Sequence, residues 1–130
     1  MADIDDLKAA FEQFVGAYNA QNLDAWAALC HDNVVSFQPF SPFPVDGQVA
    51  LRQVHQTTLA NSESASATHI NPQFRVIGTT GVVWAHSALV FKPKDGPLTT
   101  VFARSTFTFA QSDGRGLMVA SHISRLPSGN

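Results

Sequence analysis

The spacing of apolar residues in this 130-residue chain changes once, near its middle. Over residues 3–20 they recur every three or four positions, which predicts an amphipathic helix. The second half instead predicts long strands, joined by short glycine-containing turns, at about 67–78, 81–92, 98–110 and 116–125. Because short turns connect antiparallel neighbours, the sequence predicts an α+β fold, with helices on one face of a mostly antiparallel sheet.

Polar residues mark where the predicted helices begin. Asp3 is expected to cap the first helix, because its carboxylate can accept a hydrogen bond from a free backbone N–H group. Asn22 is expected to cap a short second helix that carries Trp26. Asp46 is expected to cap a third helix over about 47–60, which completes the predicted helical layer.

Length and composition favour a single domain over residues 1–130. Hydrophobic residues make up 45% of the chain and charged residues only 14%, against about 25% in typical domains, which excludes disorder as the main state. The net charge of −2 excludes the basic surface typical of nucleic-acid binding. The low fraction of charged residues also indicates that another subunit covers part of the surface.

The single cysteine, Cys30, excludes an intramolecular disulfide framework and a cysteine-based zinc cluster, and it is interpreted as a packed side chain. The five histidines lack metal-ligand spacing, so neither a metal nor another cofactor is expected. The N-terminus is acidic and no apolar run approaches about 20 residues, so we expect no signal peptide, no membrane contact and a cytoplasmic protein.

Phenylalanine is abundant, with ten residues in 130. A strand-like run at 34–37 leads into a loop with three prolines at 39–44, which excludes a regular helix there. Phe37, Phe40 and Phe43 cluster in this region. A curved sheet wrapped around helices would form a cone with an apolar mouth, and these three rings would line its lip.

Several segments share their order and spacing with one superfamily. Residues 14–26 read FVGAYNAQNLDAW and residues 46–52 read DGQVALR, followed by RSTFTF at 104–109, DGR at 113–115 and SHIS at 121–124. They resemble SnoaL-like and ketosteroid isomerase-like proteins of the nuclear transport factor 2-like superfamily, and the association domain of calcium/calmodulin-dependent kinase II. The resemblance implies a cone-shaped α+β barrel, with three N-terminal helices on a strongly curved sheet, and a homodimer packed through the sheet.

The resemblance also implies where an isomerase site would lie, and three positions have changed. Phe14 stands where the family has its oxyanion tyrosine, Gln38 where it has the carboxylate base, and Ser105 where it has a protonated aspartate. An amide cannot abstract a proton from carbon at neutral pH, so steroid isomerisation by that mechanism is not expected. Phe107 and Ala88 stand at two positions where kinase-association domains carry arginine, which favours an apolar pocket.

Histidines remain as candidate acids or bases. His55 is predicted on the third helix near the mouth of the cone, and His122 belongs to the SHIS segment. His86 lies in the middle of a strand, and whether it faces inward depends on a register that the sequence leaves open. His31 and His69 are interpreted as loop or strand-edge residues.

Two functions stay open at this stage. The first is binding of a small neutral, apolar or aromatic molecule, with or without catalysis of the isomerase, cyclase or dehydratase (lyase) type. The second is a non-catalytic homo-oligomeric assembly or partner-binding domain. The candidate ligand-binding residues are Phe14, Tyr18, Trp26, Phe37, Gln38, Phe40, Phe43, His55, His86, Ser105, Phe107 and His122. A buried acid or base centred on histidine would favour an enzyme, and a solvent-poor cone filled by phenylalanine would favour assembly.

Overall fold

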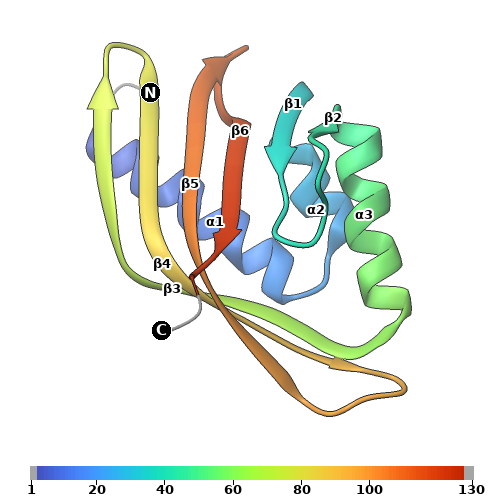
Figure 1. Cartoon of the computed structure of the whole chain (residues 1–130). Helices are drawn as coiled ribbons and strands as arrows, with labels where there is room; N and C mark the ends of the chain where they lie inside the picture. Colours follow the sequence, from blue (N-terminus) through green and yellow to red (C-terminus); the bar gives the residue numbers. More distant parts are fainter. Residues whose placement is uncertain (1–2, 128–130) are drawn as a thin grey trace.

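The computed structural model describes residues 3–127, in which three helices pack on one six-stranded sheet (Figure 1). The helices are α1 (Ile4–Asn19), α2 (Leu23–Ala28) and α3 (Gln48–Ala60). The strands are β1 (Cys30–Phe37), β2 (Val45–Asp46), β3 (Ser62–Ile77), β4 (Thr80–Pro93), β5 (Thr99–Ser112) and β6 (Arg115–Arg125). This arrangement confirms the predicted α+β fold.

The strands lie in the order β2-β1-β6-β5-β4-β3. All neighbours are antiparallel except β1 and β6, which pair in parallel, so the sheet is mixed. The long strands bend strongly along their length (Figure 1). The sheet ends in two edge strands, β2 and β3, and it forms a curved, open cone that is not closed into a barrel.

Two of the three predicted helix caps are confirmed. The Asp3 carboxylate accepts a hydrogen bond from the backbone N–H of Asp6 at 2.9 Å, and the Asn22 side-chain oxygen accepts one from Ala25 at 3.1 Å. Each satisfies a backbone donor that the first turn of a helix leaves unpaired.

The third predicted cap, Asp46, is wrong by one residue. Asp46 ends strand β2, where it pairs with Val35, and Gly47 caps α3 without a side-chain hydrogen bond. The backbone turns from strand to helix at Gly47, whose φ is +94°, a conformation that residues with a Cβ atom rarely adopt. Strand β2 therefore includes Asp46, and the cap of α3 falls at Gly47, one residue later than predicted.

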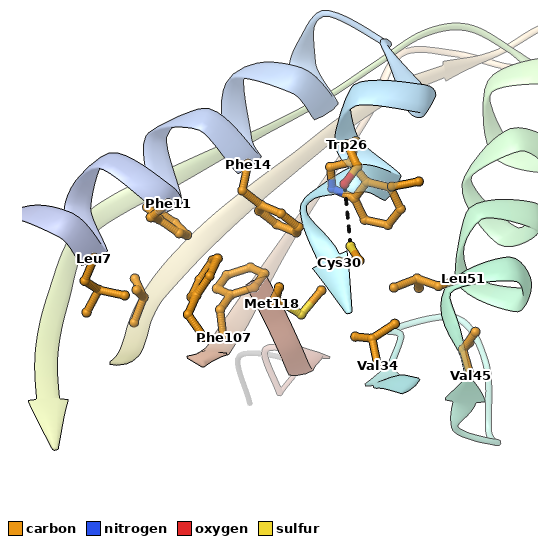
Figure 2. Close-up of a cluster of buried hydrophobic side chains, with 13 residues drawn as sticks. Leu7, Phe11, Phe14, Trp26, Cys30, Val34, Val45, Leu51, Phe107 and Met118 are labelled. Carbon is orange, nitrogen blue, oxygen red and sulfur yellow. Dashed lines mark hydrogen bonds between the residues drawn. The ribbon is translucent and has the colours of Figure 1, made fainter. Parts of the chain in front are cut away.

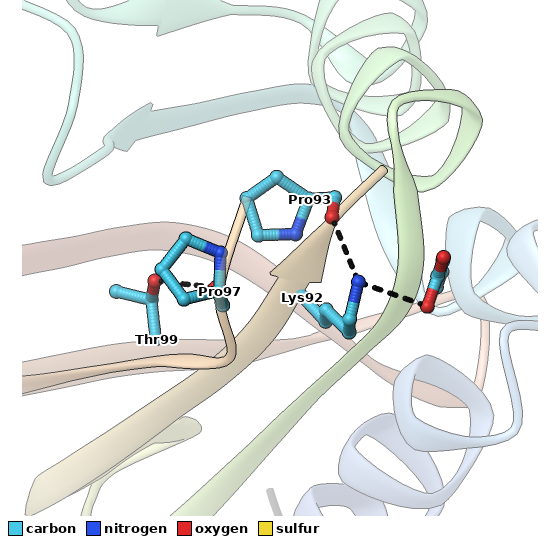
Figure 3. A network of polar contacts seen from close by, with 5 residues as sticks. Lys92, Pro93, Pro97 and Thr99 are labelled. Carbon is cyan, nitrogen blue, oxygen red and sulfur yellow. Dashed lines mark hydrogen bonds and ion pairs between the residues drawn. The ribbon is translucent and has the colours of Figure 1, made fainter. Parts of the chain in front are cut away.

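Two strands begin earlier than the sequence predicts. Strand β3 begins at Ser62, directly after α3, and β1 begins at Cys30. The first residues of β3 are small or polar and lack β-propensity, so its edge pairing with β4 decides their conformation. At this end of the pairing, Lys92 forms an ion pair with Glu63 at 3.1 Å and donates to the carbonyl oxygen of Pro93 (Figure 3). In the turn that follows, Thr99 donates to the carbonyl oxygen of Pro97.

The hydrophobic core lies between the helices and the inner face of the sheet (Figure 2). Phe11 and Phe14 of α1 meet Phe107 and Phe109 of β5, with ring centroids 5.5–6.5 Å apart. Cys30 is fully buried, and its thiol donates to the Trp26 carbonyl oxygen at 3.6 Å. Burial raises the pKa of the Cys30 thiol to about 12, so this cysteine is unreactive, in agreement with its interpretation as a packed side chain.

Candidate functional site

A cavity of about 520 Å³ lies between the helices and the inner face of the sheet, within the range of small-molecule pockets. Its apolar wall includes Phe14, Trp26, Leu51, Phe107 and Met118. These side chains belong to the hydrophobic core shown in Figure 2. Residues of β3, β4 and β6 and of the loop after β1 also line the cavity. The aromatic residues at the centre of the molecule therefore surround a cavity rather than filling it.

The lining of the cavity carries no formal charge. Across residues 3–127, none of the lining side chains is Asp, Glu, Lys or Arg. Deep polar groups come from Tyr18, Gln38, His55, His69 and Ser121. An uncharged, mostly apolar cavity favours a neutral ligand, because a charged ligand would lose its hydration without gaining a counter-ion.

Three aromatic side chains form one corner of the cavity. The His55 ring lies edge-on to Trp26 and Tyr18, with centroids 4.7 and 5.1 Å away. Burial lowers the pKa of His55 to about 4 and raises the pKa of the Tyr18 hydroxyl, because both charged forms are poorly solvated there. Both groups are therefore neutral at pH 7.

His69 was interpreted from sequence as a loop or strand-edge residue. It lies on the edge strand β3, and its place in the cavity lining was missed. Its ring packs 5.3 Å from the rings of Phe11 and Phe107. Its Nδ1 lies 2.7 Å from the Ser87 hydroxyl, which lies 2.9 Å from the Ser105 hydroxyl. Burial lowers the pKa of His69 to about 4. The alternation of small inward residues before it, Ala65 and Ala67, was the available signal.

A second polar group lies where the loop leaves β1. The Gln38 amide donates to the Ser36 hydroxyl, which lies 2.6 Å from the Ser121 hydroxyl of β6. Ser36 is fully buried, while Gln38 and Ser121 reach the cavity. The Gln38 amide is thus held at the cavity by its contact with Ser36.

The structure places seven of the twelve predicted ligand-binding residues in the cavity lining, namely Phe14, Tyr18, Trp26, Gln38, Phe40, His55 and Phe107. They come from all three helices, the loop after β1, and β5. Phe40 is 59% exposed and stacks edge-on against Phe91 at 6.0 Å, so it lies at the cavity's edge. Whether these residues bind a ligand stays a prediction.

The other five predicted residues do not line the cavity. Phe37 and His122 lie on the outer face of the sheet, where their rings are 5.2 Å apart, because the inward positions of these strands belong to Ser36 and Ser121. Phe43 is 73% exposed in the loop.

His86 and Ser105 show how the strand register decides the outcome. His86 lies exposed on the outer face, opposite Arg104 of β5, so the register left open by the sequence places it outside. Ala88 shares that face, and Leu89 reaches the cavity instead. Ser105 points inward but lies behind the lining, in contact with Ser87.

The structure offers little support for other kinds of site. Among residues 3–127, no three His, Cys, Asp or Glu side chains gather as metal ligands would. Within the same part of the chain, no helix has the length and apolarity needed to span a membrane.

The fold is a curved α+β cone with a cavity between its helices and its sheet. The SnoaL-like domain family matches residues 7–128, so the chain belongs to that family. No curated protein matches the sequence.

Solved structures share the fold at low sequence identity. A proposed dehydratase of the nuclear transport factor 2-like family from Streptomyces avermitilis has a TM-score of 0.85 and 17% identity, covering 97% of this chain and 98% of that one. A proposed aromatic ring hydroxylase from Novosphingobium aromaticivorans has a TM-score of 0.84 and 17% identity, with coverage of 98% and 93%. A ketosteroid isomerase-like protein from Erwinia carotovora atroseptica has a TM-score of 0.80 and 16% identity, with coverage of 97% and 98%.

Proposed function

We propose that this protein binds a small, neutral, apolar or aromatic molecule in its central cavity. The observation that carries the proposal is the lining itself, which surrounds about 520 Å³ with aromatic and aliphatic side chains and with no charged one among the described residues. A few fixed polar groups in an apolar cavity are the usual means of orienting such a ligand. Two of the similar structures are named for an aromatic ring and for a ketosteroid, which agrees with this class.

Binding is better supported than base catalysis. Proton abstraction works best when the base has a pKa near the operating pH, and burial holds the pKa of His55 and of His69 near 4. The lining offers no carboxylate in the described part of the chain, and Phe14 provides no oxyanion donor. An isomerase or lyase activity would therefore rest on neutral hydrogen-bond donors.

Native mass spectrometry of the freshly purified protein tests the proposal most directly. We expect an added mass of a few hundred daltons that disappears on denaturation, or that appears after incubation with a neutral aromatic probe such as 2-naphthol. Absence of any adduct in both samples would overturn the proposal and favour an assembly domain.

Tryptophan fluorescence gives an independent measurement, since the chain has only two tryptophans. Trp26 lines the cavity, whereas Trp84 stacks under Arg75 on the outer face. A Trp84→Phe variant leaves Trp26 as the sole reporter. We expect the probe to change the emission of this variant and to leave that of a Trp26→Phe variant unchanged.

The predicted homodimer through the sheet stays a prediction. Its support is the outer face, where Phe37, Ile70 and Phe102 are each about half exposed, at 45%, 46% and 55%. Light scattering after size exclusion measures the mass of the particle. A monomer at micromolar concentration would contradict the prediction without affecting the proposed ligand.

A further inference from the structure

The histidine and two serines behind the cavity form a chain whose hydrogen-bond direction can be worked out. Nδ1 of His69, the Ser87 hydroxyl and the Ser105 hydroxyl follow one another at 2.7 and 2.9 Å. Ser87 and Ser105 are 0% and 3% exposed, so bulk solvent does not reach their hydroxyls. Among the described residues, neither hydroxyl has another hydrogen-bond partner, and the three groups must therefore satisfy one another.

The direction of the chain decides which nitrogen of His69 carries its proton. If Nδ1 is the donor, Ser87 must donate to Ser105, and the Ser105 proton is left buried without an acceptor. If Nδ1 is the acceptor, Ser105 donates to Ser87 and Ser87 donates to Nδ1, so both serine hydroxyl protons have an acceptor. An unsatisfied buried donor is costly, and the second direction is therefore favoured.

The favoured direction leaves the proton of the neutral imidazole on Nε2. Among residues 3–127, Trp26 Nε1 is the one side-chain polar atom that is both sealed from solvent and without a partner. His69 Nε2 also has no hydrogen-bond partner, but it is not among the sealed atoms and is therefore accessible. Because the His69 ring lines the cavity, we infer that Nε2 is accessible from the cavity. Burial lowers the pKa of His69, which agrees with a neutral ring.

We propose that His69 presents its Nε2–H group to the cavity as a fixed donor, and that the ligand is a neutral apolar or aromatic molecule bearing a carbonyl oxygen. This inference rests on the proposed function and adds the ligand's polar group. A carboxylate lacks a basic partner among the lining residues. A carbonyl oxygen only accepts hydrogen bonds, so it is the simplest neutral partner for a fixed N–H donor.

Nitrogen-15 NMR of the histidine rings tests the tautomer on the wild-type protein, without any variant that could misfold. Two-bond couplings identify which ring nitrogen carries the proton. We expect the neutral Nε2–H form for His69 at pH 7. The Nδ1–H form, or a protonated ring, would overturn the proposal. The Ser87→Ala variant assigns the signal. It removes the hydroxyl bonded to His69 Nδ1 and should therefore change the nitrogen-15 chemical shifts of the His69 ring.

A pair of matched probes tests the ligand class. 2-Acetylnaphthalene carries a carbonyl oxygen, and 2-isopropenylnaphthalene replaces that oxygen by a methylene group of similar shape. Equilibrium dialysis measures the Kd of each. We expect the ketone to bind the wild type roughly three- to tenfold more tightly, which is the range of a neutral hydrogen bond.

Variants locate the preference. His69→Leu is expected to abolish the preference for the ketone, and His69→Gln to keep part of it, because the Gln amide also donates. His86→Gln, on the outer face, is the matched control and should keep the wild-type preference.

The outcomes separate the two proposals. Equal binding of both probes would overturn the carbonyl inference and leave the proposed function standing. Failure of both probes to bind, together with an adduct-free native mass spectrum, would overturn the proposed function itself. A ketone preference that persists in His69→Leu would overturn the assignment of His69 as the donor.

Discussion

Successive residues of each long strand point alternately to the inner and the outer face of the sheet, and the two faces differ sharply in environment. On β5, Phe107 and Phe109 are 2% and 0% exposed on the inner face, whereas Phe102 is 55% exposed on the outer face. The inner face carries His69 at an apolar cavity, and the outer face carries His86 beside Arg104. The comparison teaches that a residue's type says little about its role until its face is known.

The largest expected difference between the two faces is in the stability lost when a phenyl ring is removed from each. Phe109→Ala is expected to lower the free energy of unfolding by about 3–5 kcal/mol, because it deletes a ring packed against Phe11 and Phe14. Phe102→Ala, on the same strand, should change it by less than about 1 kcal/mol. Urea denaturation followed by circular dichroism measures both. Equal losses would show that the outer face is also packed.

Acid should destabilise the protein through the two histidines that line the cavity, and not through His86 on the outer face. The pKa of His55 and of His69 is about 4 in the folded protein against 6.5 in the unfolded chain, so the unfolded state binds more protons between these values. The free energy of unfolding should therefore fall as the pH decreases from about 6.5 to 4, by on the order of 1–3 kcal/mol per histidine. Above about pH 6.5 these two groups contribute no pH dependence.

Denaturation curves between pH 4 and 8 measure this effect. The double variant His55→Gln, His69→Gln should lose most of the slope in that window. His86→Gln, as the outer-face control, should keep the wild-type slope. A slope that survives in the double variant would place its origin in other groups.

Filling the cavity should remove binding without removing the fold. Ala65 lines the cavity from β3 and is 6% exposed, so Ala65→Phe places a ring where the ligand would lie. We expect binding of 2-naphthol to weaken by at least about tenfold, or about 1.4 kcal/mol. Thr106→Phe puts the same ring on the outer face and should leave the Kd unchanged. Native mass spectrometry or dialysis distinguishes the two.

The smallest effect should come from a contact confined to the outer face. The Arg75 guanidinium lies 5.1 Å from the centroid of the Trp84 ring. Arg75→Ala is expected to cost about 0.5–1 kcal/mol, the usual range of an exposed cation–π contact. Thermal unfolding measures the loss. A change above about 2 kcal/mol would mean that this surface is covered by another chain.

Particular residues show how far the sequence led toward the site. Phe14 and Gln38 were identified by their resemblance to family positions, and both line the cavity. His69 was missed because β3 has a bulge between Ile70 and Gln73, where Asn71 takes a φ of +49°, and the alternation is interrupted just after the histidine. Phe37 was assigned to the lip because it clusters in sequence with Phe40 and Phe43, whereas β1 turns it to the outer face, beside His122.

The sequence by itself determined the order of elements and their approximate lengths, because periodicity, caps and turns are local properties of the chain. Its motifs also indicated the SnoaL-like family. Only the tertiary structure decided which residues face the cavity. A strand exchanges its two faces with a shift of one residue, and the pairing that settles the shift joins segments far apart in sequence. His69, Ser87 and Ser105 became one hydrogen-bonded chain only when β3, β4 and β5 paired in that register.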